Sequence, residues 1–201
     1  MLKELFEAHF YRVFPKREDR VLMIEEKTAI GDFSLADPKA CLGCRFVCNE
    51  EPEKKEQLKV YGKKVVNYIS IENVFSFVRD NVGEICDYML ETNDTTILVE
   101  MTCSSTENVI GKRQKARRQL ENTLCLLYAN QMIKNHIENN AIRYVIFSWR
   151  ETFPKGEIDH VEETMRGMTV LTDVVYSPDN ESKFQFGFKL KEIRYPDTLA
   201  C

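Results

Sequence analysis

A short apolar segment in the middle of the chain, Ile97-Leu-Val, constrains the fold more than any other feature. Consecutive apolar residues without alternation are typical of a strand that is buried on both faces of a sheet. Turn-forming residues at Thr92-Asn-Asp-Thr precede this segment, and another strand pattern, Asp87–Glu91, precedes the turn. The sequence therefore predicts a hairpin whose second strand, Ile97–Cys103, lies inside a sheet.

Helical patterns flank this hairpin on both sides. Ser70 can cap a helix over Ile71–Asn81, because its hydroxyl can accept from amides of the first turn. A long helix is expected over Lys112–Glu138, followed by another buried strand at Tyr144–Trp149. Strands joined by a helical crossover lie parallel, whereas hairpin partners lie antiparallel. We therefore expect an α/β fold with a mixed β-sheet flanked by helices.

Weaker patterns extend this core at both ends of the chain. The expected elements are an N-terminal helix over Met1–Phe14, strands over Arg20–Glu25 and Val60–Ile69, and a C-terminal hairpin made by Thr169–Tyr176 and Lys183–Ile193. We expect one domain over residues 1–201. Its parts are the core at 70–149, the N-terminal helix, strands and Cys-containing segment at 1–69, and the hairpin within 168–194.

The overall composition is that of an ordinary globular protein. The formal charge is −4 and the pI about 5.6, so any binding to nucleic acid must depend on a local basic surface. No apolar run approaches the roughly 20 residues that span a bilayer, and charged residues in the first 14 argue against a signal peptide. We therefore expect no membrane association, and an odd number of cysteines, seven, without an export signal favours a reducing cytoplasmic compartment. The sequence leaves open whether the chain forms a homo-oligomer.

Two acidic residues lie on the predicted hairpin, Asp87 at the start of its first strand and Glu100 at the end of its second. Magnesium-type ions bind one or two carboxylates together with waters and a substrate phosphate. The two acids suit such a site if their side chains share a face of the sheet. The alternative, that they are ordinary acids beside strands, remains open at this point.

A strongly basic segment begins the long helix. Five cations fall within seven residues, namely Lys112, Arg113, Lys115, Arg117 and Arg118. Cations at a helix start oppose the helix dipole, so the segment favours an anion-binding surface, with a solvated basic face as the alternative. Lys112, Lys115 and Gln119 follow helical spacing and form one strip. This strip is expected to lie near Glu100 and, with the other cations, to contact nucleic acid.

The residues from Ser70 to Trp149 resemble the PD-(D/E)XK nuclease superfamily, and within it the RecB-like exonucleases. The matching features are Gly83 before Asp87, the apolar strand ending in Glu100, and a helix carrying Gln119-Leu120. The resemblance implies a restriction-endonuclease-like core, Mg²⁺ or Mn²⁺ held by Asp87 and Glu100, and a helix glutamine near the site. It also implies a third acid in the preceding helix, for which Glu72 is the candidate.

One position departs from this family. Its members place a catalytic lysine two residues after the second acid, where this chain has Thr102. We therefore expect Lys112, or as second choice Lys115, to supply the ammonium group. The expected function is a metal-dependent phosphodiester hydrolase acting on DNA in preference to RNA, resembling effectors of defence systems that rely on a protein partner for targeting. The alternative is a catalytically inactive nuclease-like domain that binds nucleic acid or a protein.

A cluster of cysteines, Cys41, Cys44 and Cys48, has the spacing of zinc or iron–sulfur ligands. Both kinds of centre usually take four protein ligands, and only three are present locally. Buried or incidental thiols are therefore the favoured interpretation, and a zinc or iron–sulfur site is the alternative.

Overall fold

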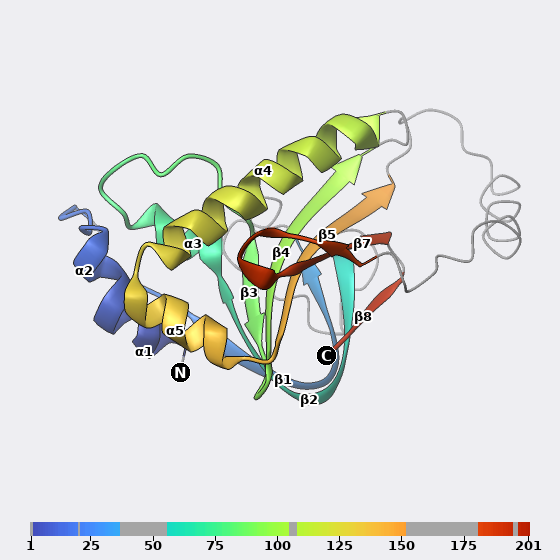
Figure 1. The fold of residues 1–201 in the computed structure, drawn as a ribbon, viewed down its shortest axis with the longest axis horizontal. Helices are drawn as coiled ribbons and strands as arrows, with labels where there is room; N and C mark the ends of the chain where they lie inside the picture. The colour runs from blue at the N-terminus through green and yellow to red at the C-terminus, as the bar shows by residue number, and fades with distance from the viewer. Residues whose placement is uncertain (1, 20, 37–55, 105–107, 152–180, 195–196) are drawn as a thin grey trace, which may run out of the picture.

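The computed structural model describes residues 2–19, 21–36, 56–104, 108–151, 181–194 and 197–201. Within these residues, helices lie against one face of a large mixed β-sheet (Figure 1). The elements in chain order are α1 Leu2–Leu5, the π-helical turn η1 Phe6–Phe10, α2 Tyr11–Val13, β1 Glu26–Ala36, β2 Glu56–Ser70, α3 Ile71–Ser76, β3 Tyr88–Glu91, β4 Thr95–Ser104, α4 Val109–Tyr128, α5 Gln131–Asn139, β5 Ile142–Glu151, β6 Ser182–Lys183, the 3₁₀ turn η3 Gln185–Gly187, β7 Lys189–Arg194 and β8 Thr198–Ala200. The expected α/β fold with a mixed sheet and flanking helices is confirmed.

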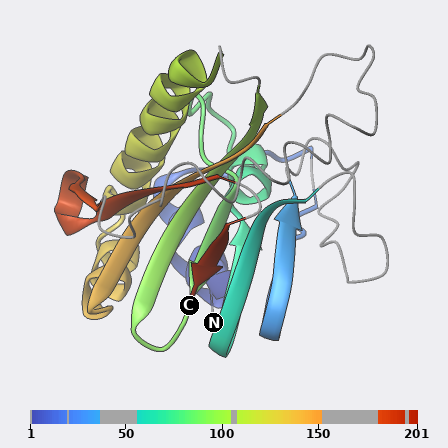
Figure 2. The same cartoon turned by 90° about the vertical axis from the view of Figure 1, so that its right-hand side faces the viewer.

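The strand order in the sheet is β1-β2-β3-β4-β5-β7-β6, and β8 pairs in parallel with β2. The expected hairpin is present, because β3 and β4 are antiparallel and joined by a short turn. The strands β4 and β5 are parallel, as expected for strands connected by helices, and β7 continues the parallel arrangement. Figure 2 shows α4 along one side of the sheet and β1 at one of its edges.

The sheet separates two apolar clusters. On the helix-covered face, Met89 of β3 and Leu98 of β4 pack with Leu120 and Leu124 of α4. On the opposite face, Tyr88, Val99 and other strand residues form a second cluster. Side chains alternate between faces along a strand, so this division fixes which face each β3 and β4 residue occupies. The interior strand predicted from Ile97-Leu-Val is thus confirmed as buried on both faces.

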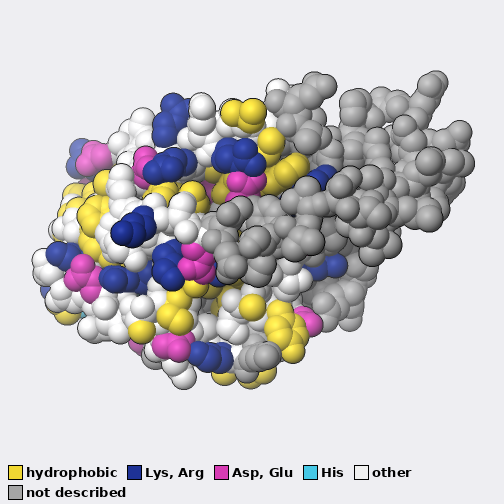
Figure 3. All heavy atoms as spheres, turned by 45° about the vertical axis from the view of Figure 1, so that its right-hand side comes forward, with side chains coloured by type: hydrophobic (Ala, Val, Ile, Leu, Met, Phe, Trp, Pro, Cys, Tyr) yellow, Lys and Arg dark blue, Asp and Glu magenta, His cyan; other side chains and the backbone are white. Residues whose placement is uncertain are grey.

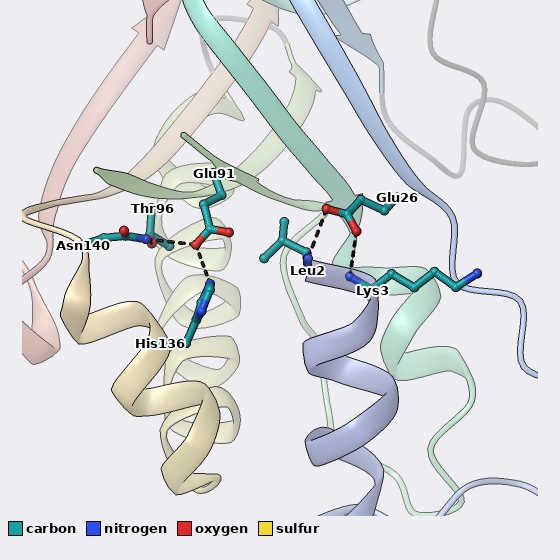
Figure 4. Close-up of polar contacts among 7 residues, drawn as sticks. All are labelled: Leu2, Lys3, Glu26, Glu91, Thr96, His136 and Asn140. Carbon is teal, nitrogen blue, oxygen red and sulfur yellow. Dashed lines mark hydrogen bonds and ion pairs between the residues drawn. The ribbon is translucent and has the colours of Figure 1, made fainter. Parts of the chain in front are cut away.

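The N-terminal helical segment covers part of the helix-side cluster. Phe6 and Phe10 are fully buried there, and the Phe10 ring contacts Phe75 edge to face at 4.7 Å between centroids. The first amides of the segment, those of Leu2 and Lys3, donate to the two carboxylate oxygens of Glu26 (Figure 4). The N-terminal helix is confirmed, and Glu26 of β1 accepts the hydrogen bonds of its first two described amides.

Two of the elements expected in the N-terminal half were wrong, and a third was confirmed within a longer strand. Residues 21–25 form no strand, because the extended segment begins at Glu26 and continues through Gly31 to Ala36. The helix expected over Ile71–Asn81 ends at Ser76, and its predicted cap is confirmed, since Ser70 Oγ accepts from the Asn73 amide at 3.1 Å. The strand predicted at Val60–Ile69 is confirmed within the longer β2.

The long helix predicted over Lys112–Glu138 is also wrong, because the chain breaks into α4 and α5 at Asn130. The Asn130 side chain accepts from the amides of Met132 and Ile133, at 3.0 and 3.2 Å, and so begins a new helix. The side-chain nitrogen Nδ2 of Asn130 donates to the backbone carbonyl of His9 at 2.7 Å. Asparagine thus ends one helix, starts the next and ties the junction to the N-terminal segment.

The C-terminal hairpin was predicted incorrectly in its second half. Lys183–Ile193 is not one strand, because the chain turns back at Gln185–Gly187 and pairs β6 with β7. Phe186 in this turn adopts a left-handed backbone conformation, with φ of 53°. The other expected strand, Thr169–Tyr176, and the cysteines Cys41, Cys44 and Cys48 lie outside the described residues.

Candidate functional site

The two candidate acids lie at the same end of the β3–β4 hairpin. The end pair of the antiparallel ladder is Tyr88 of β3 with Val99 of β4, and Asp87 and Glu100 are the adjoining residues of the two segments. The Asp87 amide donates to the Val99 carbonyl at 3.0 Å, so the register changes at Asp87, just before β3 begins. Since Leu98 faces the helices, alternation places Glu100 on that same face. The structure therefore brings the predicted acidic pair together.

Both carboxylates are largely buried, with exposed fractions of 6% for Asp87 and 7% for Glu100. Oδ2 of Asp87 accepts from the Met101 amide at 2.7 Å, and its backbone carbonyl accepts from the Ile71 amide at 2.9 Å. Asp87 therefore also has a structural role, because it joins the start of β3 to β4 and to α3. Buried carboxylates are costly unless charge or hydrogen bonds compensate them.

The thiol of Cys86 lies within electrostatic reach of both acids. Burial raises the pKa of this thiol well above its usual range, and the carboxylates of Glu100 and Asp87 raise it further, against a lowering contribution from a hydrogen bond with Thr123. Two negative groups acting on one buried atom indicate that they share a small volume. Such a concentration of negative charge suits a cation.

Helix α4 lies over this end of the hairpin and is fixed to the segment that leads into Asp87. Gln119 Nε2 donates to the Ile85 carbonyl at 3.0 Å, and Thr123 Oγ1 accepts from the Cys86 amide at 2.9 Å. Gln119 is buried, as expected for a helix residue near the site, and its amide group holds the backbone two residues before Asp87. The sequence predicted the position of Gln119 but not this partner.

Lys112, the first choice for the missing ammonium group, lies in the first turn of α4. It is exposed and precedes the buried residues Ala116 and Gln119 by four and seven positions, so all three share a side of the helix. Thr102 follows Glu100 by two residues on the same face of β4, and it pairs in register with Trp149 of β5. Lys112 therefore lies at the start of α4, on the side of the helix that carries Ala116 and Gln119, about 10 Å along the axis from Gln119.

Three of the five helix cations form ion pairs within the chain. Arg113 Nε lies 2.6 Å from the Glu192 carboxylate, Lys115 lies 3.0 Å from Glu84, and Arg117 lies 2.9 Å from Glu121. Within the described ranges, Lys112 and Arg118 form no ion pair. Exposed pairs of this kind are weak and exchange readily with other anions. On the face shown in Figure 3, basic side chains alternate with acidic ones and form no continuous basic surface.

Glu192 is a site-proximal residue that sequence reasoning missed. It pairs in register with Phe147 of β5, which in turn pairs with Glu100. Its carboxylate accepts from Arg113 and from Trp149 Nε1, the latter at 3.0 Å. Glu192 therefore joins the first turns of α4 to the carboxyl ends of β5 and β7. Nothing in the local sequence around residue 192 indicates these partners.

Glu72, the candidate third acid, is not shown to join the acidic pair. Glu72 is a partly exposed residue in the first turn of α3, one position from the Ile71 amide that contacts Asp87. Among the residues that the structure describes, no three side chains of His, Cys, Asp or Glu gather closely enough to hold a metal ion. A cation at the acidic pair would thus have two protein ligands, as is common for Mg²⁺ completed by water and phosphate.

A second buried carboxylate, Glu91 at the other end of β3, has a structural role. His136 Nε2 of α5 lies 2.7 Å from Glu91 Oε1, and Asn140 Nδ2 donates to the same oxygen at 2.9 Å and to Thr96 (Figure 4). The hydrogen bond with Glu91 raises the pKa of His136, and burial opposes this shift. The cluster attaches α5 to the hairpin and leaves Asp87 and Glu100 as the candidate site.

Comparison of the chain with protein-family models, curated proteins and solved structures found no match in any of the three. No helix in the described part of the chain has the length and apolar character that crossing a membrane requires. The site must therefore be interpreted from its own geometry.

Proposed function

We propose that the protein is a metal-dependent phosphodiester hydrolase that acts on DNA, with a restriction-endonuclease-like core. The observation that carries this proposal is the pair of buried carboxylates, Asp87 and Glu100, that adjoin the Tyr88–Val99 pair at the end of the hairpin, beneath a helix that begins with basic residues. The order of α3, β3, β4, α4 and β5 supports the resemblance to the PD-(D/E)XK superfamily.

The residues fit a hard divalent cation. Carboxylate oxygens are the ligands that Mg²⁺ and Mn²⁺ prefer, and neighbouring side chains in an antiparallel pair lie close enough to share one ion. Such an ion would polarise a phosphoryl oxygen and lower the pKa of a bound water. Side chains around the two acids would supply the remaining steps of the mechanism.

Each neighbouring residue then has a role. The Lys112 ammonium group is the proposed donor that orients water or neutralises the scissile phosphate. It would replace the family's lysine, whose position is occupied here by Thr102. Gln119 keeps the backbone before Asp87 in position through the Ile85 carbonyl. The apolar cluster of Val109, Ala116, Phe147 and Trp149 lies next to the acidic pair and limits access of bulk water.

The cations of α4 would hold the DNA backbone. Lys112 and Arg118 are exposed and form no ion pair with other described residues, so they are the first candidates for phosphate contacts. Lys115 and Arg117 can exchange their surface partners for phosphates at small cost. Arg113 is bound by two nitrogens to Glu192, and we assign it a positioning role.

The test is cleavage of supercoiled plasmid and of labelled oligonucleotides with Mn²⁺. We expect cleavage by the wild type that falls at least about 100-fold in Asp87→Asn and in Glu100→Gln. Asp94→Asn is the control, because Asp94 lies in the turn of the same hairpin, with its side chain 44% exposed and paired with Lys64. Equal cleavage by Glu100→Gln and wild type would contradict the proposal. Salt-sensitive DNA binding without cleavage, weakened by Arg118→Ala, would instead support the inactive nuclease-like domain.

A further inference from the structure

Phe186 presents an exposed aromatic ring beside the C-terminal end of α4, and its backbone is strained. Three phenylalanines occur within five residues of the C-terminal segment, and two of them, Phe184 and Phe188, are buried with exposed fractions of 9% and 1%. Phe186 lies between them and is 42% exposed. A side chain needed only to fill the core would be buried like its neighbours.

The backbone of Phe186 is held in the left-handed region, with φ of 53° and ψ of 29°. A bulky residue is strained there and persists only where the surroundings impose the conformation. The turn is closed by two backbone hydrogen bonds, from Phe188 to the Gln185 carbonyl and from Phe184 to the Phe188 carbonyl. Backbone strain of this kind concentrates at functional sites.

The ring of Phe186 stacks on Tyr128 of α4, with 4.2 Å between centroids and 24° between planes. About 16 Å nearer the start of α4, the guanidinium of Arg117 lies over the Phe184 ring at 5.3 Å and pairs with Glu121. We call these four residues, Phe184, Phe186, Tyr128 and Arg117, the Phe186 platform. It combines an aromatic ring that stacks on Tyr128 with a cation farther along the same helix, and Lys183 in the same turn segment is exposed.

We propose that the Phe186 platform binds an unpaired base of single-stranded nucleic acid by stacking on Phe186, with Arg117 contacting a phosphate of the same strand. Surfaces of this type combine aromatic rings with cations, because every base has a π-face and every link carries a charge. This inference rests on the proposed function and deepens it by assigning the form of the substrate. Tyr128 of the platform lies nine residues after Gln119 on α4, so the platform is about 14 Å along the helix axis from the residue that contacts the segment before Asp87.

Binding of a fluorescein-labelled thymidine oligonucleotide, followed by anisotropy in EDTA, tests the assignment. We expect Phe186→Ala to weaken binding about 5- to 100-fold. Phe186→Trp should bind as wild type does, and Phe186→Leu should bind as poorly as the alanine variant. Met132→Ala is the control, because Met132 is an exposed apolar side chain on α5, and it should bind as wild type does.

Three results would overturn the platform: no binding of the oligonucleotide by wild type, equal binding by wild type and Phe186→Ala, or full binding by Phe186→Leu. The leucine result would mean that apolar contact rather than stacking is needed. The assay contains no metal and requires no cleavage, so its outcome is separate from that of the manganese assay. Circular dichroism of each variant shows that a loss of binding is not a loss of folding.

Discussion

Replacing Glu100 by glutamine should stabilise the metal-free protein while removing its response to manganese. Glutamine has nearly the same shape and keeps an oxygen acceptor, so the main change is the loss of one negative charge. In the wild type this charge lies at the same end of the hairpin as Asp87, and both residues are more than nine-tenths buried. Without a cation, the two carboxylates repel each other in the folded state.

The magnitude follows from the position of the two acids beside the Tyr88–Val99 pair. Neighbouring side chains of an antiparallel pair lie on the order of 5 Å apart. Two unit charges at about 5 Å interact by about 3 kcal/mol at an effective dielectric constant of 20. Allowing for interactions that the substitution loses, we expect a gain of about 1–3 kcal/mol. For a chain of this length, that corresponds to an increase in Tm of about 2–10 °C.

Manganese should reverse the order of stability. A ligand at one hundred times its Kd stabilises the folded state by about 2.7 kcal/mol, which raises the Tm of the wild type by about 5–10 °C. Glu100→Gln should show little of this increase, and Asp94→Asn should keep it. The assay is thermal unfolding by circular dichroism in EDTA and in Mn²⁺. A Glu100→Gln protein that unfolds earlier than wild type in EDTA, or that keeps the full manganese shift, would refute the reasoning.

Two further predictions concern stability away from the site. The raised pKa of His136 means that its pair with Glu91 stabilises fully below about pH 6.5 and loses this contribution as the pH rises through the folded pKa. The Tm difference between wild type and His136→Gln should therefore be larger at pH 5.5 than at pH 8.5, and an equal difference would contradict the pairing. Asn130→Ala should lower the free energy of unfolding by about 1–2 kcal/mol, because it removes the cap of α5. The exposed Asn139→Ala variant serves as control in chemical denaturation, and equal midpoints for the two variants would contradict this role.

The central hairpin could be predicted because its signal is local. Ile97-Leu-Val has no alternation, and the turn residues before it leave few alternative pairings. This pairing also brought Asp87 and Glu100 to the same end of the hairpin. The crossover from β4 through helix to β5 then determined the parallel neighbour.

The incorrect predictions arose where tertiary contacts outweigh local pattern. Helical spacing continues across Asn130, and only the His9 carbonyl and the amides of α5 show why the helix breaks there. The break in Lys183–Ile193 depends on the left-handed Phe186, whose ring stacks on a helix far away in the sequence. No short window of sequence contains these partners.

The candidate site shows the same division. The acids and Gln119 could be located from spacing, because the strands and the helix that carry them have strong local patterns. The partner of Arg113 could not, since Glu192 is 79 residues away and β7 must first pair with β5. The sequence therefore located the five cations on one helix but gave no sign that Arg113 is bound to Glu192.

The most direct test of the account is a crystal structure of the protein with Mn²⁺, with data collected at the manganese absorption edge. We predict one anomalous peak within about 2.0–2.3 Å of carboxylate oxygens from both Asp87 and Glu100. The same peak should be absent from crystals of Glu100→Gln grown under identical conditions. Carboxylates that point apart, with no manganese between them at concentrations that saturate the thermal shift, would contradict the proposed metal site.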